Sequence, residues 1–262
     1  MPAMEPTAIA LVTGGSSGIG REMCRQLHGR GHALLAVSLG ADELASLADE
    51  LAGGAPVHTL ATDLAADGAA ARVAEAAAAL GEVDVLINSA GFGMMGDHLD
   101  LDPARVAQML GVNLVALTEL CARFGRDMRA RGRGRILNVA STAAFQPLPQ
   151  LAAYAASKHY VDAFSLALAD ELAGTGVTVS VLYPGPTRTP FLAGAGVDDS
   201  RGSVAHRMAM RPERVAARAI DGMFAGERRI VPGSMNRSHF WLSRVLPDRV
   251  AAQAWQRITK RL

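Results

Sequence analysis

The chain has 262 residues, half of them hydrophobic, which is enough for one large α/β domain with its own buried core. Its 26 basic and 25 acidic residues leave a net charge of +1, so no overall positive charge draws it to nucleic acid. The two cysteines, Cys24 and Cys121, lie far apart in segments with helical patterns. We therefore expect two buried thiols in a reducing compartment and no disulfide framework.

The first seven residues lack a basic segment followed by a long apolar core. No stretch approaches the roughly 20 apolar residues that a membrane span requires. These features predict a cytoplasmic, soluble protein.

Short apolar runs alternate with longer helical patterns along most of the chain. Each run is continuous, which is typical of strands buried on both faces of a parallel sheet. The expected strands cover residues 8–12, 33–38, 57–61, 83–87, 135–140 and 177–182. The expected helices cover residues 18–29, 42–52, 69–80, 103–129 and 151–173. This alternation predicts right-handed crossovers and a doubly wound sheet.

The pattern loosens after residue 185. A Gly-rich stretch with an acidic tip covers residues 193–203, and a helix over 212–225 and a short strand over 229–231 are expected after it. We interpret residues 186–211 as a mobile lid within a single domain, residues 1–262. The last segment, residues 237–262, is a basic amphipathic tail with six basic residues against one acidic residue, Asp248: Arg237, Arg244, Arg249, Arg257, Lys260 and Arg261.

The first expected strand runs into a glycine-rich turn, and a helical pattern follows the turn. Gly14, Gly18 and Gly20 let a ligand approach the backbone closely, and the helix start offers free N–H groups to phosphate. A tight turn alone also needs glycine for steric reasons. In this strand-turn-helix context we expect the turn to bind the pyrophosphate of a dinucleotide.

Tyr154 and Lys158 form a second motif. Lys158 is one of only two lysines in the chain, and a spacing of four places both side chains on one helix face. A nearby ammonium favours the phenolate, so we expect Lys158 to lower the pKa of Tyr154 from near 10. Tyr154 is then a candidate general acid or base near neutral pH.

Together these motifs resemble the short-chain dehydrogenase/reductase superfamily, in its short, non-extended branch. The resemblance spans nearly the whole chain and rests on Gly14, Gly18, Gly20, the run Asn88-Ser89-Ala90-Gly91, Asn113, Ser141, Tyr154, Lys158 and the pair Pro184-Gly185. It implies a Rossmann-type parallel sheet of seven strands, in the order 3-2-1-4-5-6-7, with helices on both faces. It also implies NAD(P)-dependent oxidoreduction of a carbonyl or secondary alcohol.

The resemblance further implies the role of each catalytic residue. Ser141 would hydrogen-bond the substrate oxygen, and Tyr154 would exchange a proton with it. Lys158 would hold the nicotinamide ribose, and Asn113 would anchor a water that links Lys158 to solvent. Two hydroxyl donors suit the negative charge that develops on a carbonyl oxygen as it accepts hydride. Taken singly, Ser141 is also explained as a strand-end cap and Asn113 as a polar residue inside a helix.

The cofactor residues implied by the resemblance follow the ends of five strands. Asp63 and Leu64 would meet the adenine, and Asn88 would either line the cofactor or join neighbouring strands. The loop from Pro184 would hold the carboxamide and present the B face for transfer of the pro-S hydride. The full set is Gly14, Ser16, Ser17, Gly18, Ile19, Gly20, Ser38, Asp63, Leu64, Asn88, Ala90, Gly91, Tyr154, Lys158, Pro184, Gly185, Thr187 and Thr189.

The end of the second expected strand departs from the pattern. It reads Val37-Ser38-Leu39-Gly40, with neither an acid for the ribose 2'-hydroxyl nor a base for a 2'-phosphate. Ser16, Ser17, Ser38 and Arg21 are candidates to bind a phosphate, although an arginine on a helix surface is usually solvated. The missing acid favours NADP(H) over NAD(H).

The residues expected near the nicotinamide carry little charge: Phe92, Met94, Met95, Phe145, Leu148, Pro149, Phe191, Met208 and Met210. They indicate a small apolar ketone or secondary alcohol, and methionine linings adapt to bulky shapes. Several of these methionines serve equally well as core under the lid. No metal is expected.

Other functions stay open at this point. One is a non-catalytic NADP-binding regulatory protein, which would tolerate loss of Tyr154 or Lys158. Another is a membrane-surface scaffold that uses the basic tail, although such tails more often pack on their own domain or on a second subunit. The resembled family pairs the helices over 103–129 and 151–173 across a dimer axis, so a homodimer or homotetramer is expected.

Overall fold

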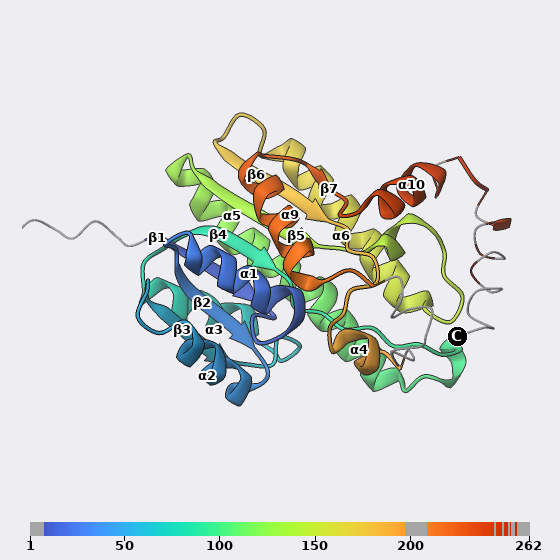
Figure 1. Cartoon of the computed structure of the whole chain (residues 1–262), viewed down its shortest axis with the longest axis horizontal. Coiled ribbons are helices and arrows are strands. Elements are labelled where there is room, and N and C mark those ends of the chain that lie inside the picture. Colours follow the sequence, from blue (N-terminus) through green and yellow to red (C-terminus); the bar gives the residue numbers. More distant parts are fainter. Residues whose placement is uncertain are drawn as a thin grey trace, which may run out of the picture.

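The computed structural model describes residues 8–196, 209–243, 245–247, 249–250, 252 and 255. In this part of the chain, one parallel sheet has the strand order β3-β2-β1-β4-β5-β6-β7, which confirms the predicted topology (Figure 1). The strands are β1 (Ala8–Thr13), β2 (Ala33–Ser38), β3 (Val57–Ala61), β4 (Glu82–Asn88), β5 (Gly134–Val139), β6 (Val177–Leu182) and β7 (Arg229–Ile230).

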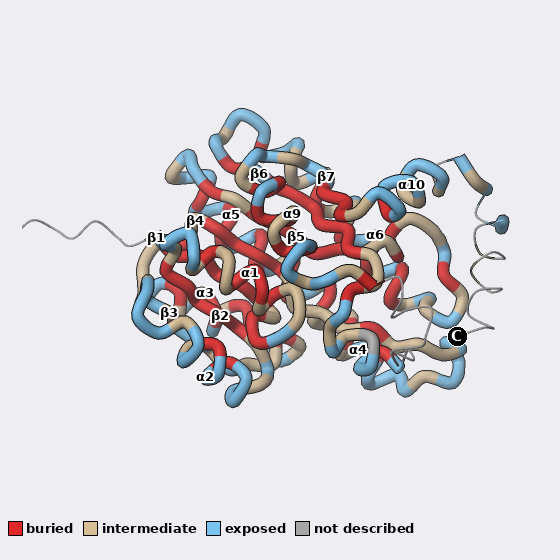
Figure 2. Tube along the Cα trace, viewed as in Figure 1, coloured by how far each residue is buried: buried red, intermediate tan, exposed pale blue. Residues whose placement is uncertain are grey.

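Helices cover both faces of the sheet. The longer ones are α1 (Gly18–Gly29), α2 (Ala41–Glu50), α3 (Ala69–Ala78), α4 (Pro103–Leu110), α5 (Leu117–Arg131), α6 (Ala152–Glu171), α9 (Pro212–Phe224) and α10 (Ser234–Ser243). The shorter helices are the 3-10 helices η1 (His98–Asp100) and η3 (Thr142–Phe145), the π-helix η2 (Gly111–Ala116) and α7 (Phe191–Gly194). One hydrophobic core joins the sheet to α1, α2 and α9, and the other joins it to α3, α5 and α6. The strands between these two cores are the most buried part of the molecule (Figure 2).

The edge strand β3 differs from its prediction. The central strands are buried on both faces, as their continuous apolar sequences predict. In β3, however, His58, Thr59 and Ala61 are exposed, so the interpretation of residues 57–61 as a doubly buried strand is wrong. The physical reason is position: β3 pairs only with β2 and has no strand on its outer side.

The single helix predicted over residues 103–129 is also wrong in detail. The chain forms α4, then the π-helical turn η2, then α5, which continues to Arg131. A π-helical turn widens the backbone, and such turns are common at functional sites. Here it contains Asn113, whose buried amide bonds to the backbone of Phe92.

A buried polar network joins the middle of the sheet to α6. Asn88 of β4 donates to Asn138 of β5 at 2.8 Å, and Asn138 donates to Ser165 of α6 at 2.9 Å. Cys121 of α5 lies within 3.5 Å of both asparagines, and burial raises the pKa of its thiol to about 12. Both cysteines are free and buried, as predicted.

The two ends of the predicted lid pair with each other. Thr187 and Met210 form an isolated parallel bridge, and the amides of Arg188 and Met210 donate to Met210 and Pro186 respectively. Residues 197–208, including Met208, lie outside the described residues, as do Arg244, Asp248 and residues 256–262 of the predicted tail. Within the described ranges, no helix combines the length and the apolar character needed to cross a membrane.

The packing of α1 against its preceding turn gives a test of the fold. A methyl group at Gly20 would overlap the Gly14 carbonyl oxygen, whereas one at Gly29, in the same helix, meets nothing within 4 Å. We expect Gly20→Ala to destabilise the protein by about 2 kcal/mol or more, because backbone must move to relieve the overlap.

Gly29→Ala is the matched control. Alanine has a higher helix propensity than glycine, so we expect the free energy of unfolding to rise by zero to about 1 kcal/mol. Urea unfolding of both variants measures the difference. Equal stabilities would contradict the close approach of α1 to its turn.

Candidate active site

A cavity of about 840 Å³ opens at the carboxyl ends of the strands. Gly14, Ser38, Ser89, Ser141 and Pro184 line it, and they follow or end β1, β2, β4, β5 and β6. Parallel strands bring their carboxyl ends to one edge of a sheet, which is where ligands of open α/β sheets bind. The sheet thus gathers residues that are up to 170 positions apart in the sequence.

The glycine-rich turn forms one wall of this cavity. Gly14 and Gly18 have φ of +69° and +54°, the left-handed region that favours glycine. A methyl group at Gly14 would lie 2.9 Å from the backbone of Ala90. Helix α1 begins directly after the turn, with no side-chain cap from Ser17 and no acidic residue in its first turn. Its free N–H groups therefore suit the pyrophosphate of a dinucleotide.

Most predicted cofactor residues line the cavity. They are Gly14, Ser17, Gly18, Ile19, Gly20, Ser38, Asp63, Leu64, Ala90, Gly91, Tyr154, Lys158, Pro184, Gly185, Thr187 and Thr189. Asp63 also accepts hydrogen bonds from the Ala65 amide and from Gln108. Asn88 does not line the cavity and belongs to the buried network between strands, which favours its structural interpretation. Ser16 lies just behind the lining, with its hydroxyl 2.8 Å from that of Ser38.

Tyr154 and Lys158 lie on one face of α6, and both line the cavity while remaining almost fully buried. The Lys158 ammonium donates to the Val139 carbonyl oxygen at 2.9 Å. Its Nζ lies 5.8 Å from the centre of the Tyr154 ring. The predicted pairing on one helix face is therefore what the structure has.

The pKa of Tyr154 shifts in the direction opposite to the prediction. Burial raises the pKa of its phenol from 10.0 to about 12, against a smaller lowering by a hydrogen bond with Ser141. Burial also lowers the pKa of Lys158 from 10.5 to about 8. Removal from water disfavours the charged form of both groups, and this effect outweighs the attraction that Lys158 exerts on a phenolate. Tyr154 is therefore a neutral phenol at neutral pH.

Ser141 follows β5 in extended conformation and lies beside Tyr154. Its Oγ accepts the Ala143 amide at 3.1 Å, so it caps η3, and its hydroxyl is close enough to Tyr154 to lower the pKa of that phenol. The capping interpretation and the catalytic one are both compatible with this geometry. A serine hydroxyl can accept from an amide and donate to an oxygen at the same time.

Asn113 lies behind the cavity wall. Its Oδ1 accepts from the Phe92 amide at 3.2 Å, and its Nδ2 donates to the Phe92 carbonyl and to Ser157 Oγ, each at 3.1 Å. Ser157 in turn donates to the carbonyl oxygen of Tyr154 at 2.7 Å. A methyl group on Gly91 would lie 2.8 Å from Asn113 Oδ1 and 3.5 Å from Lys158 Nζ. Asn113 and Lys158 thus both lie next to Gly91 at the cavity wall.

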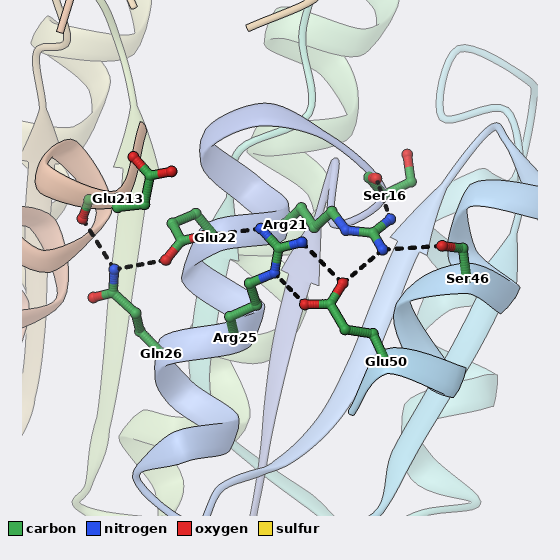
Figure 3. Close-up of polar contacts among 8 residues, drawn as sticks. All are labelled: Ser16, Arg21, Glu22, Arg25, Gln26, Ser46, Glu50 and Glu213. Carbon is green, nitrogen blue, oxygen red and sulfur yellow. Dashed lines mark hydrogen bonds and ion pairs between the residues drawn. The ribbon is translucent and has the colours of Figure 1, made fainter. Parts of the chain in front are cut away.

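At the adenosine end, Arg21 is engaged by other residues. Its guanidinium donates to the Ser16 carbonyl oxygen, to Ser46 Oγ and to Glu50 (Figure 3). It also donates to the carbonyl oxygen of Glu43. Glu50 also binds Arg25, and the two guanidinium groups hold its pKa down at about 2. These bonds account for the position of Arg21 without a phosphate.

Of the nine residues predicted near the nicotinamide, Phe92, Met95, Leu148 and Phe191 line the cavity. Met94 packs in the hydrophobic cluster that contains Tyr154 and Leu148. Phe145 was predicted wrongly, because its ring packs in the core against Tyr183 at 5.3 Å and Phe240 at 5.0 Å. Its aromatic character signals burial equally in a core and in a pocket. Met210 likewise packs against the core between α9 and the sheet.

Several lining residues were not predicted as site residues. They come from α4, from the loop after η3 and from the C-terminal segment: Arg105, Gln108, Gln146, Leu151, Met235, His239, Leu242, Leu246 and Trp255. Trp255 donates its indole N–H to the Pro149 carbonyl oxygen at 3.1 Å, which ties the C-terminal segment to the rim of the cavity. The sequence signal was the apolar side of the tail, which does not show what that side covers.

Comparisons with known proteins agree with this site. The family model described as short chain dehydrogenase matches residues 8–199. A galactitol 2-dehydrogenase (L-tagatose-forming) from Cereibacter sphaeroides is 40% identical over 186 residues, covering 70% of this chain and 72% of that protein. A D-threitol dehydrogenase from Mycolicibacterium smegmatis is 34% identical over 219 residues, covering 81% and 84%. A solved short-chain dehydrogenase from Sphingobium yanoikuyae in complex with NADPH has a TM-score of 0.80 at 26% identity and covers 92% and 96%.

The chain belongs to the short-chain dehydrogenase/reductase family. It is an NAD(P)-dependent oxidoreductase that acts on alcohol or carbonyl groups. The resemblance drawn from the motifs is confirmed, and a non-catalytic role is not favoured.

The buried ammonium of Lys158 predicts a pH-dependent stability. Between pH 8 and 10 the unfolded chain holds a proton on this lysine that the folded chain has largely lost, so Lys158 makes unfolding harder as pH rises. This contribution of Lys158 to the stability of the folded state is lost as pH falls through about 8. We expect the stability difference between wild type and Lys158→Met to shift in favour of wild type from pH 8 to 10.

Urea unfolding at several pH values measures this difference. Arg126→Met, on the exposed face of α5, is the control, and its difference from wild type should stay constant over the same range. A constant difference for Lys158→Met as well would contradict a lowered lysine pKa.

Proposed function

We propose that this enzyme interconverts an apolar ketone and its secondary alcohol, with Tyr154 as general acid and base. The observation that carries the proposal is that Ser141, Tyr154 and Lys158 line the cavity together, with Lys158 Nζ 5.8 Å from the centre of the Tyr154 ring. A bound nicotinamide cofactor supplies or accepts the hydride. The chain's own residues orient the substrate oxygen and move the proton.

In the reduction direction, the Tyr154 hydroxyl donates its proton to the substrate oxygen. Its raised pKa keeps the phenol protonated near neutral pH, which suits a proton donor. Ser141 supplies a second hydroxyl donor, and two donors stabilise the negative charge on that oxygen better than one. The Lys158 ammonium then favours the phenolate that proton transfer leaves behind. Asn113 acts from behind the wall, through its bonds to Ser157 and the Phe92 backbone.

The apolar lining supports the substrate class. Phe92, Leu148, Phe191 and Trp255 line the end of the cavity near Tyr154, whose ring packs 5.6 Å from that of Phe191. Two of the similar proteins are named for the polyols galactitol and threitol, whose hydroxyls call for many polar partners. The large apolar side chains here favour a ketone with a hydrocarbon body instead.

We also propose that NADP(H) is preferred over NAD(H). No acidic residue ends β2, and the Ser16 and Ser38 hydroxyls lie together there, able to donate to a 2'-phosphate. The similar structure from Sphingobium yanoikuyae holds NADPH, which supports the same choice.

Two features of organisation belong to the same proposal. The predicted lid is held at its described ends, residues 186–196 and 209–211, by the Thr187–Met210 bridge. Homodimers or homotetramers form through η2, α5 and α6, where Val115 and Tyr160 are exposed apolar side chains.

Replacement of Tyr154 by phenylalanine tests the proton-transfer role. We expect Tyr154→Phe to lower kcat by about 100-fold or more, the size of a lost general acid, while dinucleotide affinity stays within about threefold. Steady-state reduction of a ketone panel and fluorescence titration with the reduced cofactor measure the two effects. Turnover at the wild-type rate would refute the assignment of Tyr154.

Ser38→Asp tests the cofactor choice. A carboxylate at this position repels a 2'-phosphate and accepts from a ribose 2'-hydroxyl, so we expect kcat/KM with NADPH to fall at least about tenfold relative to NADH. Ser38→Ala is the control, and it should lower the NADPH to NADH ratio less. If wild type already prefers NADH, the proposed NADP(H) preference is wrong.

A further inference from the structure

Gln146 and His239 form a polar pair on the cavity wall that the family motifs do not include. Gln146 follows η3 and His239 lies on α10, so the pair joins segments 93 residues apart. His239 Nε2 lies 3.2 Å from Gln146 Oε1, and both residues line the cavity. Neither residue takes part in the proton-transfer geometry around Tyr154 and Ser141.

Core packing holds this pair in place. The His239 ring meets the edge of Phe145 at 5.8 Å and an interplanar angle of 84°. Phe145 is itself packed against Tyr183 and Phe240. Tyr183 is fully buried, and its hydroxyl donates to Asp162 of α6. The His239 imidazole therefore packs against a buried aromatic cluster that holds it in place.

The pair leaves one acceptor and one donor group for a ligand. An amide oxygen only accepts, so His239 Nε2 must donate to Gln146, which leaves His239 Nδ1 as an acceptor. The Gln146 amide nitrogen carries two further N–H donors. Within the described part of the chain, neither His239 Nδ1 nor Gln146 Nε2 has a hydrogen-bond partner. Burial lowers the pKa of His239, so the neutral, accepting form prevails at neutral pH.

The surroundings of the pair are mainly apolar. Leu148, Leu151, Leu242 and Trp255 line the cavity together with it. A few polar groups in an apolar pocket set the orientation and specificity of a ligand. A pocket that hydrogen-bonds a ligand hydroxyl also rejects the analogue that lacks it, since its polar groups then stay unpaired.

We propose that His239, held in one tautomer by Gln146, binds a second oxygen of the substrate, a hydroxyl group remote from the carbon that exchanges hydride. Gln146 Oε1 accepts from His239 Nε2, which leaves Nδ1, on the other side of the ring, to accept a proton from a ligand. A hydroxyl can donate to Nδ1, whereas a carbonyl oxygen has no proton to donate. The substrate class is therefore an apolar hydroxyketone, or the corresponding diol. This inference rests on the proposed function, whose reaction it narrows to one kind of substrate.

A matched series of ketones tests the inference. The probes are phenylalkan-2-ones with chains of two to six methylene groups between ring and carbonyl, each with and without a hydroxyl group at the para or meta position of the ring. Wild type, His239→Phe and Gln146→Met are compared, since phenylalanine keeps the ring contact with Phe145 and methionine keeps the length of glutamine. His32→Phe is the control, because His32 stacks on Phe224 and does not line the cavity.

For at least one chain length, we expect wild type to reduce the hydroxylated ketone with a kcat/KM about tenfold or more above that of its parent. His239→Phe and Gln146→Met should each bring this ratio to about twofold or less, with the parent ketone reduced within about threefold of the wild-type rate. His32→Phe should keep the wild-type ratio.

Two results overturn the inference alone: reduction of the ketones without preference for any hydroxylated member, or a preference that survives both pocket substitutions. The absence of turnover for every ketone, with NADPH and with NADH, overturns the proposed function as well. The two failures are therefore distinguishable.

Discussion

The hydrogen bond from Lys158 to the Val139 carbonyl oxygen sets the register of the proposed catalytic residues. A buried ammonium needs a partner, and this one ties α6 to the end of β5. Four residues along a helix rise about 6 Å, and two residues of extended chain span about 6.6 Å. With Lys158 held at Val139, Tyr154 therefore lies level with Ser141, which is extended at φ −170°. One contact thus brings the two hydroxyls together.

The reactive pair was predictable because its signal is local. Tyr154 and Lys158 share one helix face by spacing alone, and the doubly wound sheet follows from the alternation of strands and helices. The order of the strands came from the family resemblance. The pKa of Tyr154 was predicted in the wrong direction, since the spacing shows the nearby charge but not the depth of burial. Burial depends on the packing of α6 against the sheet, η3 and α7, which no local pattern contains.

Features that depend on tertiary position escaped prediction for the same reason. The strand β3 was predicted to be buried on both faces, yet it lies at the edge of the sheet, and its polar residues His58 and Thr59 are exposed. The π-helical turn around Asn113 has a helical sequence pattern, and its bond to Phe92, 21 residues away, is not visible in that pattern. Phe145 and His239 show the difference most clearly. The phenylalanine predicted for the pocket belongs to the core, and it supports a histidine, missed as a site residue, that lines the cavity.

The two ends of the cavity consequently come from different kinds of sequence. The cofactor end is built from turns directly after strands, where glycine geometry and backbone N–H groups permit few alternatives. The substrate end is built from η3, α10 and the segment with Trp255, which pack by side-chain shape. Substitutions in α10 can alter substrate choice without moving the Lys158–Val139 bond, because α10 contacts η3 rather than the reactive face of α6. Reaction type and substrate range can therefore diverge independently on this fold.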